Sequence, residues 1–104
     1  MAKITRITKS AAEKMLADVP QDKQFWCQDN RVFKNMEELA IGLKAMSDET
    51  FRYHANETKN DFAKWVQEVV GDTRLSVALL RSSTRLQAVQ AAAERVTALE
   101  SAAR

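Results

Sequence analysis

The densest group of residues that could support chemistry lies between residues 51 and 65. It contains the single histidine of the chain, His54, with acidic, amide and aromatic residues nearby. On a continuous helix His54, Glu57 and Asp61 would share one face, where one nitrogen and two oxygens could hold a metal ion. However, Thr58 followed by Asp61 is a capping pattern, which predicts a new helix beginning near residue 59. The candidate residues of this site are His54, Asn56, Lys59, Asn60, Asp61 and Trp65.

The same residues also have a structural interpretation, which we favour. Histidine, asparagine and aspartate at a helix–helix corner can cap helix ends and bond to one another, above packed aromatic rings. No residue resembles a nucleophile for which His54 could act as general base, and no pocket-forming loop is evident. Cys27 lies beside aromatic residues, which favours a small core side chain over a reactive thiol. We therefore expect no enzymatic activity, no cofactor and no metal site.

Two sets of basic residues could contact phosphates. The formal net charge of +2 does not by itself indicate nucleic-acid binding, and a solvated face is the favoured interpretation. A helix-turn-helix around Gly71 is disfavoured because residues 75–80 are too apolar for a helix in a DNA groove, unless only Arg74, Arg81 and Arg85 face outward. The aromatic residues Trp26 and Phe33 could form a stacking platform for a single strand. The basic sets are Lys3, Arg6 and Lys9 near the N-terminus, and Arg74, Arg81 and Arg85 on one helix face.

Local signals predict a mainly helical domain with one hairpin. Ser10 with Glu13 predicts a helix that runs to Val19, and the apolar residues around Asp29-Asn30 predict a β-hairpin over about residues 24–34. Further helices are predicted from capping or stop signals at Asn35, Ser47, Thr58, Gly71 and Asp72. Residues 75–80 are apolar nearly all round, so we expect this stretch to be buried.

The C-terminal segment, residues 83–104, is an alanine-rich helix with few large apolar residues. Its apolar positions alternate spacings of three and four, which is typical of a coiled-coil seam. This seam could pair with another chain, or the helix could lie back along its own domain. The residues expected to make the interaction are Leu86, Val89, Val96 and Leu99.

Length and composition limit the architecture. A chain of 104 residues forms one domain, and two glycines with one proline exclude a glycine-rich phosphate loop. No apolar run approaches the roughly 20 residues of a transmembrane helix, so we expect no membrane association and a cytoplasmic protein. We predict a compact bundle of four or five short helices with a hairpin and a long C-terminal helix. The expected divisions are a basic arm (1–9), a helical domain (10–82) and the C-terminal helix (83–104).

Several short motifs follow one another between Phe25 and Leu80. They are Val32-Phe33-Lys34-Asn35, Glu37-Glu38-Leu39-Ala40, Met46-Ser47-Asp48-Glu49-Thr50-Phe51, Tyr53-His54, Lys59-Asn60-Asp61-Phe62-Ala63 with Trp65, and Gly71-Asp72. This pattern resembles a small domain of unknown function that recurs in archaeal and bacterial proteins. The resemblance covers over half of the chain and implies no activity. The chain departs from the pattern at Asn30, where glycine is expected, and at Ala55, where valine is expected.

Three functions follow from these observations. The first is a non-enzymatic protein-interaction or oligomerisation module that docks through the C-terminal helix or the hairpin face, with itself or another protein as partner. The second is a nucleic-acid-binding accessory protein that uses the two basic sets. The third is binding of a small ligand or metal near His54.

Overall fold

The computed structural model describes residues 7–104, which fold into six α-helices and one two-stranded antiparallel hairpin. This confirms the predicted mainly helical class with a hairpin and a long C-terminal helix. A 3₁₀ turn precedes the hairpin, and a π turn at Val66–Val70 extends α4. The elements are α1 (Lys9–Leu16), β1 (Phe25–Trp26), β2 (Val32–Phe33), α2 (Met36–Ala45), α3 (Asp48–His54), α4 (Asp61–Trp65), α5 (Thr73–Leu80) and α6 (Arg85–Ala103).

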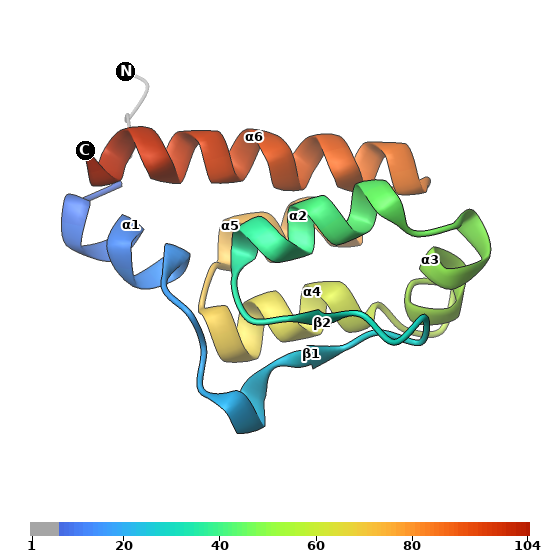
Figure 1. The fold of residues 1–104 in the computed structure, drawn as a ribbon. Coiled ribbons are helices and arrows are strands. Elements are labelled where there is room, and N and C mark those ends of the chain that lie inside the picture. Colours follow the sequence, from blue (N-terminus) through green and yellow to red (C-terminus); the bar gives the residue numbers. More distant parts are fainter. Residues whose placement is uncertain (1–6) are drawn as a thin grey trace, which may run out of the picture.

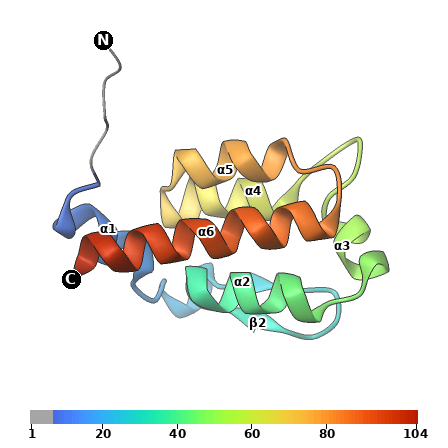
Figure 2. The same ribbon diagram turned by 90° about the horizontal axis from the view of Figure 1, so that it is seen from above.

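Helix α6 lies along one side of the molecule and the hairpin lies on the opposite side, with the shorter helices between them (Figure 1). Seen from above, α6 runs between α2 on one side and the α4–α5 pair on the other (Figure 2). It packs on α1, α2 and α5 and supplies buried side chains to the common core. None of the helices within residues 7–104 combines the length and the hydrophobicity required to span a bilayer.

The hairpin docks on the helices through aromatic rings. Phe25 pairs with Phe33 across the two strands, and their rings stack with centroids 5.7 Å apart. Phe25 also stacks on Phe62 of α4 at 5.2 Å, and Phe62 stacks on Phe51 of α3 at 5.6 Å. A two-stranded hairpin is marginal in water by itself, so this stack is what fixes β1 and β2 to the domain.

Most of the predicted helix signals are confirmed. The side chains of Asn35, Ser47 and Asp72 each accept a hydrogen bond from a backbone N–H three residues later, which starts α2, α3 and α5. Gly71 ends the α4 segment with φ 85°, a left-handed conformation that glycine adopts at little cost. Asn30 in the hairpin turn has φ 73°. The position where the resemblance expects glycine therefore does need a residue that tolerates positive φ.

Two predicted caps are wrong. Helix α1 is capped by Thr8, whose hydroxyl accepts from the N–H of Ala11, so it begins before Ser10. It also ends at Leu16, because the chain then becomes extended and the N–H of Val19 donates to the carbonyl of Lys34 instead.

Thr58 does not cap α4, because its N–H and its hydroxyl both donate to Asn56 Oδ1, at 3.0 and 2.7 Å. Asn60 caps the helix instead by accepting from the N–H of Ala63 at 3.0 Å.

The predicted burial of residues 75–80 is wrong in part. Leu75 and Leu79 are buried, but Leu80 is 63% exposed and Val77 is 39% exposed. The reason is geometric, since α5 packs on α4 and α6 and its remaining side stays open to solvent.

Candidate functional site

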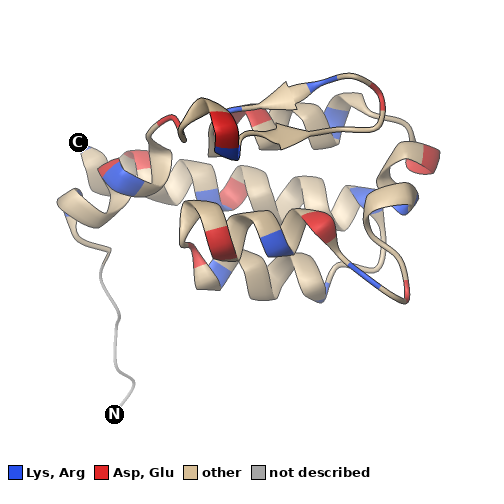
Figure 3. Cartoon of the chain, turned by 90° about the horizontal axis from the view of Figure 1, so that it is seen from below, with Lys and Arg blue, Asp and Glu red and all other residues tan. Residues whose placement is uncertain are grey.

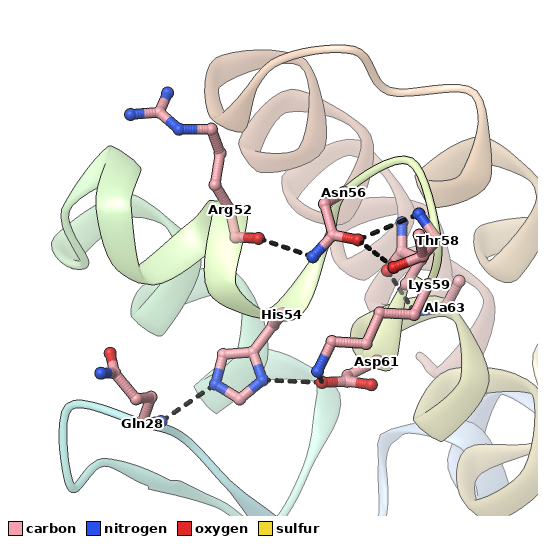
Figure 4. A network of polar contacts seen from close by, with 9 residues as sticks. Gln28, Arg52, His54, Asn56, Thr58, Lys59, Asp61 and Ala63 are labelled. Atoms are coloured by element: carbon pink, nitrogen blue, oxygen red, sulfur yellow. Dashed lines mark hydrogen bonds and ion pairs between the residues drawn. The ribbon is translucent and has the colours of Figure 1, made fainter.

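His54 lies at the end of α3 and is held by two hydrogen bonds (Figure 4). The backbone N–H of Gln28 donates to its Nε2 at 2.9 Å, and its Nδ1 lies 3.0 Å from Asp61 Oδ2. A backbone N–H can only donate, so Nε2 must be the unprotonated nitrogen. The ring is therefore in the Nδ1–H tautomer, and it donates to the carboxylate of Asp61.

The surroundings of this pair are aromatic and partly charged. The ring of His54 is buried, with its centroid 5.1 Å from that of Phe25 and 5.3 Å from that of Phe62. Lys59 Nζ lies 3.0 Å from Asp61 Oδ2 and 5.0 Å from the centroid of the Tyr53 ring. Burial would raise the pKa of Asp61, but the hydrogen bonds from His54 and Lys59 and the charge of Lys59 outweigh it and lower the pKa.

The remaining polar residues of this group bond to the backbone. Asn56 donates to the carbonyl of Arg52 at 3.0 Å, and Asn60 donates to that of Leu79 at 3.2 Å in addition to capping α4. Trp65 Nε1 donates to the carbonyl of Lys23 at 2.8 Å, which fastens α4 to the segment before the hairpin. Figure 4 shows the guanidinium of Arg52 directed away from these contacts. The group therefore joins α3, α4 and the hairpin turn.

The geometry leaves His54 little capacity for chemistry. Both ring nitrogens are bonded, so a metal ion or a substrate proton would have to displace Asp61 or the N–H of Gln28. Helix α3 ends at His54 and α4 begins at Asp61, so His54, Glu57 and Asp61 do not share a continuous helix face. Among residues 7–104, no three histidine, cysteine or acidic residues are grouped so that they could hold a metal.

Cys27 is buried beside the hairpin turn. Its pKa is raised, mainly because burial disfavours the thiolate, and the nearby Asp29 adds to this effect through its side chain. Since the thiolate is the nucleophilic form, this position is poorly suited to reaction.

The predicted basic sets are not brought together. Lys3 and Arg6 lie outside the described residues, and Lys9 is exposed on the first turn of α1. Arg85 donates to Asp48 Oδ1 at 2.7 Å and to the carbonyls of Leu43 and Lys44 at 3.1 and 3.0 Å, so it caps the end of α2. Arg74 and Arg81 remain exposed. Acidic and basic positions are mixed over most of the described helices (Figure 3), whereas α5 contains no acidic residue.

The predicted interaction residues of α6 are divided between core and surface. Val96 and Leu99 are buried, and Val89 is partly buried against the same core. Leu86, at the start of the helix, is 68% exposed. The heptad-like positions therefore face this chain's own domain, and Leu86 is the member of the set most open to a partner.

A second feature of α6 is a buried ion pair that the sequence did not indicate. Asp72 is fully buried, and Arg95 donates to both of its carboxylate oxygens, at 2.7 Å from Nε and 3.0 Å from Nη2. Asp72 was expected only as the cap of α5. Its pairing with Arg95, 23 residues away on a surface helix, has no local sequence signal.

The structure also contains a cleft that the sequence did not indicate. Its volume is about 1280 Å³, and it lies between the loop that joins α3 to α4 and the turn that joins α5 to α6. Phe51 and Ala55, both buried core residues, contribute to its lining together with the exposed Leu80 and Leu86. The sequence predicts that Leu80 is buried, because residues 75–80 are apolar nearly all round. Such a stretch does not reveal which side of its helix lacks a neighbour.

A smaller hollow of about 330 Å³ lies beside His54 and Asp61, which both contribute to its lining. Trp26, Trp65 and Val69 contribute to its lining, and Trp26 is 74% exposed on the outer face of the hairpin. This hollow is open and holds no unpaired buried polar atom, because all buried side-chain nitrogens and oxygens among the described residues are hydrogen-bonded.

No protein-family model, curated protein or solved structure matches this chain significantly.

Proposed function

We propose that this protein is a non-enzymatic interaction module that docks a partner protein at the cleft between the α3–α4 loop and the α5–α6 turn. The observation that carries the proposal is that Leu80 and Leu86, exposed to 63% and 68%, line this one cleft of about 1280 Å³. Two large aliphatic side chains left in water next to a concave surface are typical of a docking site.

The cleft is a better docking site than the seam of α6. Burying a leucine side chain stabilises a complex by roughly 1.5–3 kcal/mol, before the cost of association. At the cleft a partner can bury leucine side chains without any part of the domain having to unfold. To use Val96 and Leu99, α6 would have to leave the core and break the buried Asp72–Arg95 pair.

The cleft is also more readily explained by a protein than by a nucleic acid. A phosphate backbone gains nothing from two exposed leucines, and Arg85, one of the expected phosphate contacts, is already bonded to α2 and Asp48. Nucleic-acid binding through Arg74 and Arg81 is the alternative.

The test is site-specific photo-crosslinking in cells that naturally make the protein. A benzophenone amino acid at Ser83, an exposed residue that lines the cleft, should crosslink one defined protein. Adding Leu80→Asp should abolish the crosslink, because a carboxylate cannot be buried in an apolar contact without a partner. The crosslinked product also reports whether the partner is a second copy of this chain.

The control places the same amino acid at Glu13, an exposed residue on α1 at the other end of the molecule. It should give no specific product. Equal crosslinking from both positions, or a Ser83 crosslink that survives Leu80→Asp, would contradict docking at the cleft.

A further inference from the structure

We propose that the partner segment is an acidic amphipathic helix that lies along α5, with apolar side chains against Val77 and Leu80 and carboxylates against Arg74 and Arg81. This inference rests on the proposed docking function and specifies the chemistry of the partner. It follows from the exposed side of α5, which continues from the cleft at Leu80.

The apolar part of this surface is a short stripe. Val77 and Leu80 are three residues apart, so they are neighbours on one side of the helix. They are 39% and 63% exposed, whereas Leu75 and Leu79 on the inner side are buried. Leu86 lines the cleft together with Leu80, which extends the stripe across the α5–α6 turn.

The charged part of the surface has one sign. Arg74 and Arg81 are both exposed, and neither makes an ion pair within the described part of the chain. No acidic residue occurs between Asp72 and Glu94, and Asp72 is buried and neutralised by Arg95.

Two other acids line the nearby cleft. Asp48 is paired with Arg85, and Glu57 belongs to the α3–α4 loop on the opposite side of the cleft. The two arginines thus lie along one edge of the apolar stripe and give it a positive charge that α5 and the α5–α6 turn do not neutralise.

The spacing on α5 suits a helical partner. Arg74 lies in α5 and Arg81 is its C-cap residue, still in a helical conformation, so the seven-residue spacing corresponds to about 10.5 Å along the helix axis. A partner helix with glutamates seven residues apart presents carboxylates at the same interval and can hold two leucines between them. Guanidinium groups bind carboxylates through paired hydrogen bonds, which gives such a contact both strength and orientation.

The experiment uses the full chain and three synthetic helical peptides labelled with fluorescein. The first carries two leucines between two glutamates seven residues apart; the others have glutamine or lysine in place of glutamate. Fluorescence anisotropy should show that the glutamate peptide binds at least tenfold more tightly than the lysine peptide. In the double variant Arg74→Glu/Arg81→Glu this order should be reversed, because the charges on α5 are reversed.

The outcomes separate this inference from the proposed function. If all three peptides bind equally and Leu80→Asp abolishes their binding, the cleft is a docking site but the acidic partner is wrong. If no peptide binds, the inference is overturned, whereas the crosslink at Ser83 still tests docking itself. Binding of a labelled DNA duplex that is lost in the arginine variant, without peptide binding, would overturn it in favour of nucleic acid. If the double variant does not fold, the single variant Arg81→Gln replaces it, and the preference for the glutamate peptide over the lysine peptide should then become smaller but not reverse; an unchanged preference would overturn the inference.

Discussion

Removal of Arg95 is the substitution for which the structure predicts the largest single effect on stability. Asp72 is fully buried and accepts three hydrogen bonds, one from the N–H of Leu75 at 3.2 Å and two from Arg95. In Arg95→Met the aliphatic part of the side chain is retained, but the carboxylate loses two of its donors and the positive charge with which it is paired. Breaking a buried ion pair in this way costs about 3–5 kcal/mol.

The assays are urea unfolding, which gives the free energy of unfolding, and thermal unfolding, both at neutral pH and both followed by far-UV circular dichroism and tryptophan fluorescence. At about 4 °C per kcal/mol for a domain of this size, the melting temperature should fall by roughly 12–20 °C. The double variant Asp72→Asn/Arg95→Met should be more stable than Arg95→Met alone. It buries no isolated charge, and asparagine can still cap α5.

The matched control is Arg31→Met, which breaks the ion pair with Asp29. In that pair the Arg31 side chain is 45% exposed, compared with 13% for Arg95. Exposed pairs contribute less than about 1 kcal/mol, so this variant should unfold nearly like the original protein. If Arg95→Met were no more damaging than Arg31→Met, our interpretation of the buried pair as a tie between α6 and the domain would be refuted.

Four further variants test other parts of the structure. His54→Ala should cost about 2–4 kcal/mol in chemical unfolding, because it leaves a cavity and an unpaired backbone N–H; an unchanged stability would instead favour a ligand-binding role. The difference in free energy of unfolding between Asp61→Asn and the original protein should become smaller as pH falls below about 4. The pKa of Asp61 is lowered in the folded state, so its carboxylate stabilises the fold above the ordinary pKa of the group. This stabilisation is lost as pH falls through the lowered value. A stability difference that does not change with pH would contradict this. Gly42→Ala should cost about 1–3 kcal/mol, because the added methyl group would overlap the buried ring of Phe33. A chain truncated after Ser82 should lose its cooperative melting transition, because α6 provides part of the core; a folded fragment would show that residues 10–82 form an independent domain.

Hydrogen bonds from two arginines of α6 hold this helix on the domain, and they bear on the proposed function. Arg85 fixes the start of the helix to the end of α2, and Arg95 fixes its middle to the Gly71–Asp72 turn. Leu80 ends α5 and Leu86 lies in the first turn of α6, and both line the cleft. A fixed position of α6 therefore also fixes the shape of the cleft. A partner can then bind without first ordering this surface, which lowers the cost of association.

The sequence by itself determined those features that depend on residues within about one helical turn. Asn35, Ser47 and Asp72 start their helices through side-chain contacts with a backbone N–H three residues later, and Gly71 ends one through its own φ. The errors at Ser10 and Thr58 are local as well. In each case a polar residue two positions away caps the helix instead, Thr8 for α1 and Asn60 for α4. At α4 the competing Thr58 is bonded to Asn56, outside the helix.

Only the tertiary structure decided which side of each helix is covered. Leu79 and Leu80 are adjacent and chemically identical, yet one is buried and the other is exposed, because α4 and α6 cover one side of α5. The apolar positions of α6 would suit a second chain as well as its own domain, and only the fold shows that Val96 and Leu99 face inward. The hydrophobic effect has no direction, so an apolar pattern specifies that a surface must be covered but does not specify what covers it.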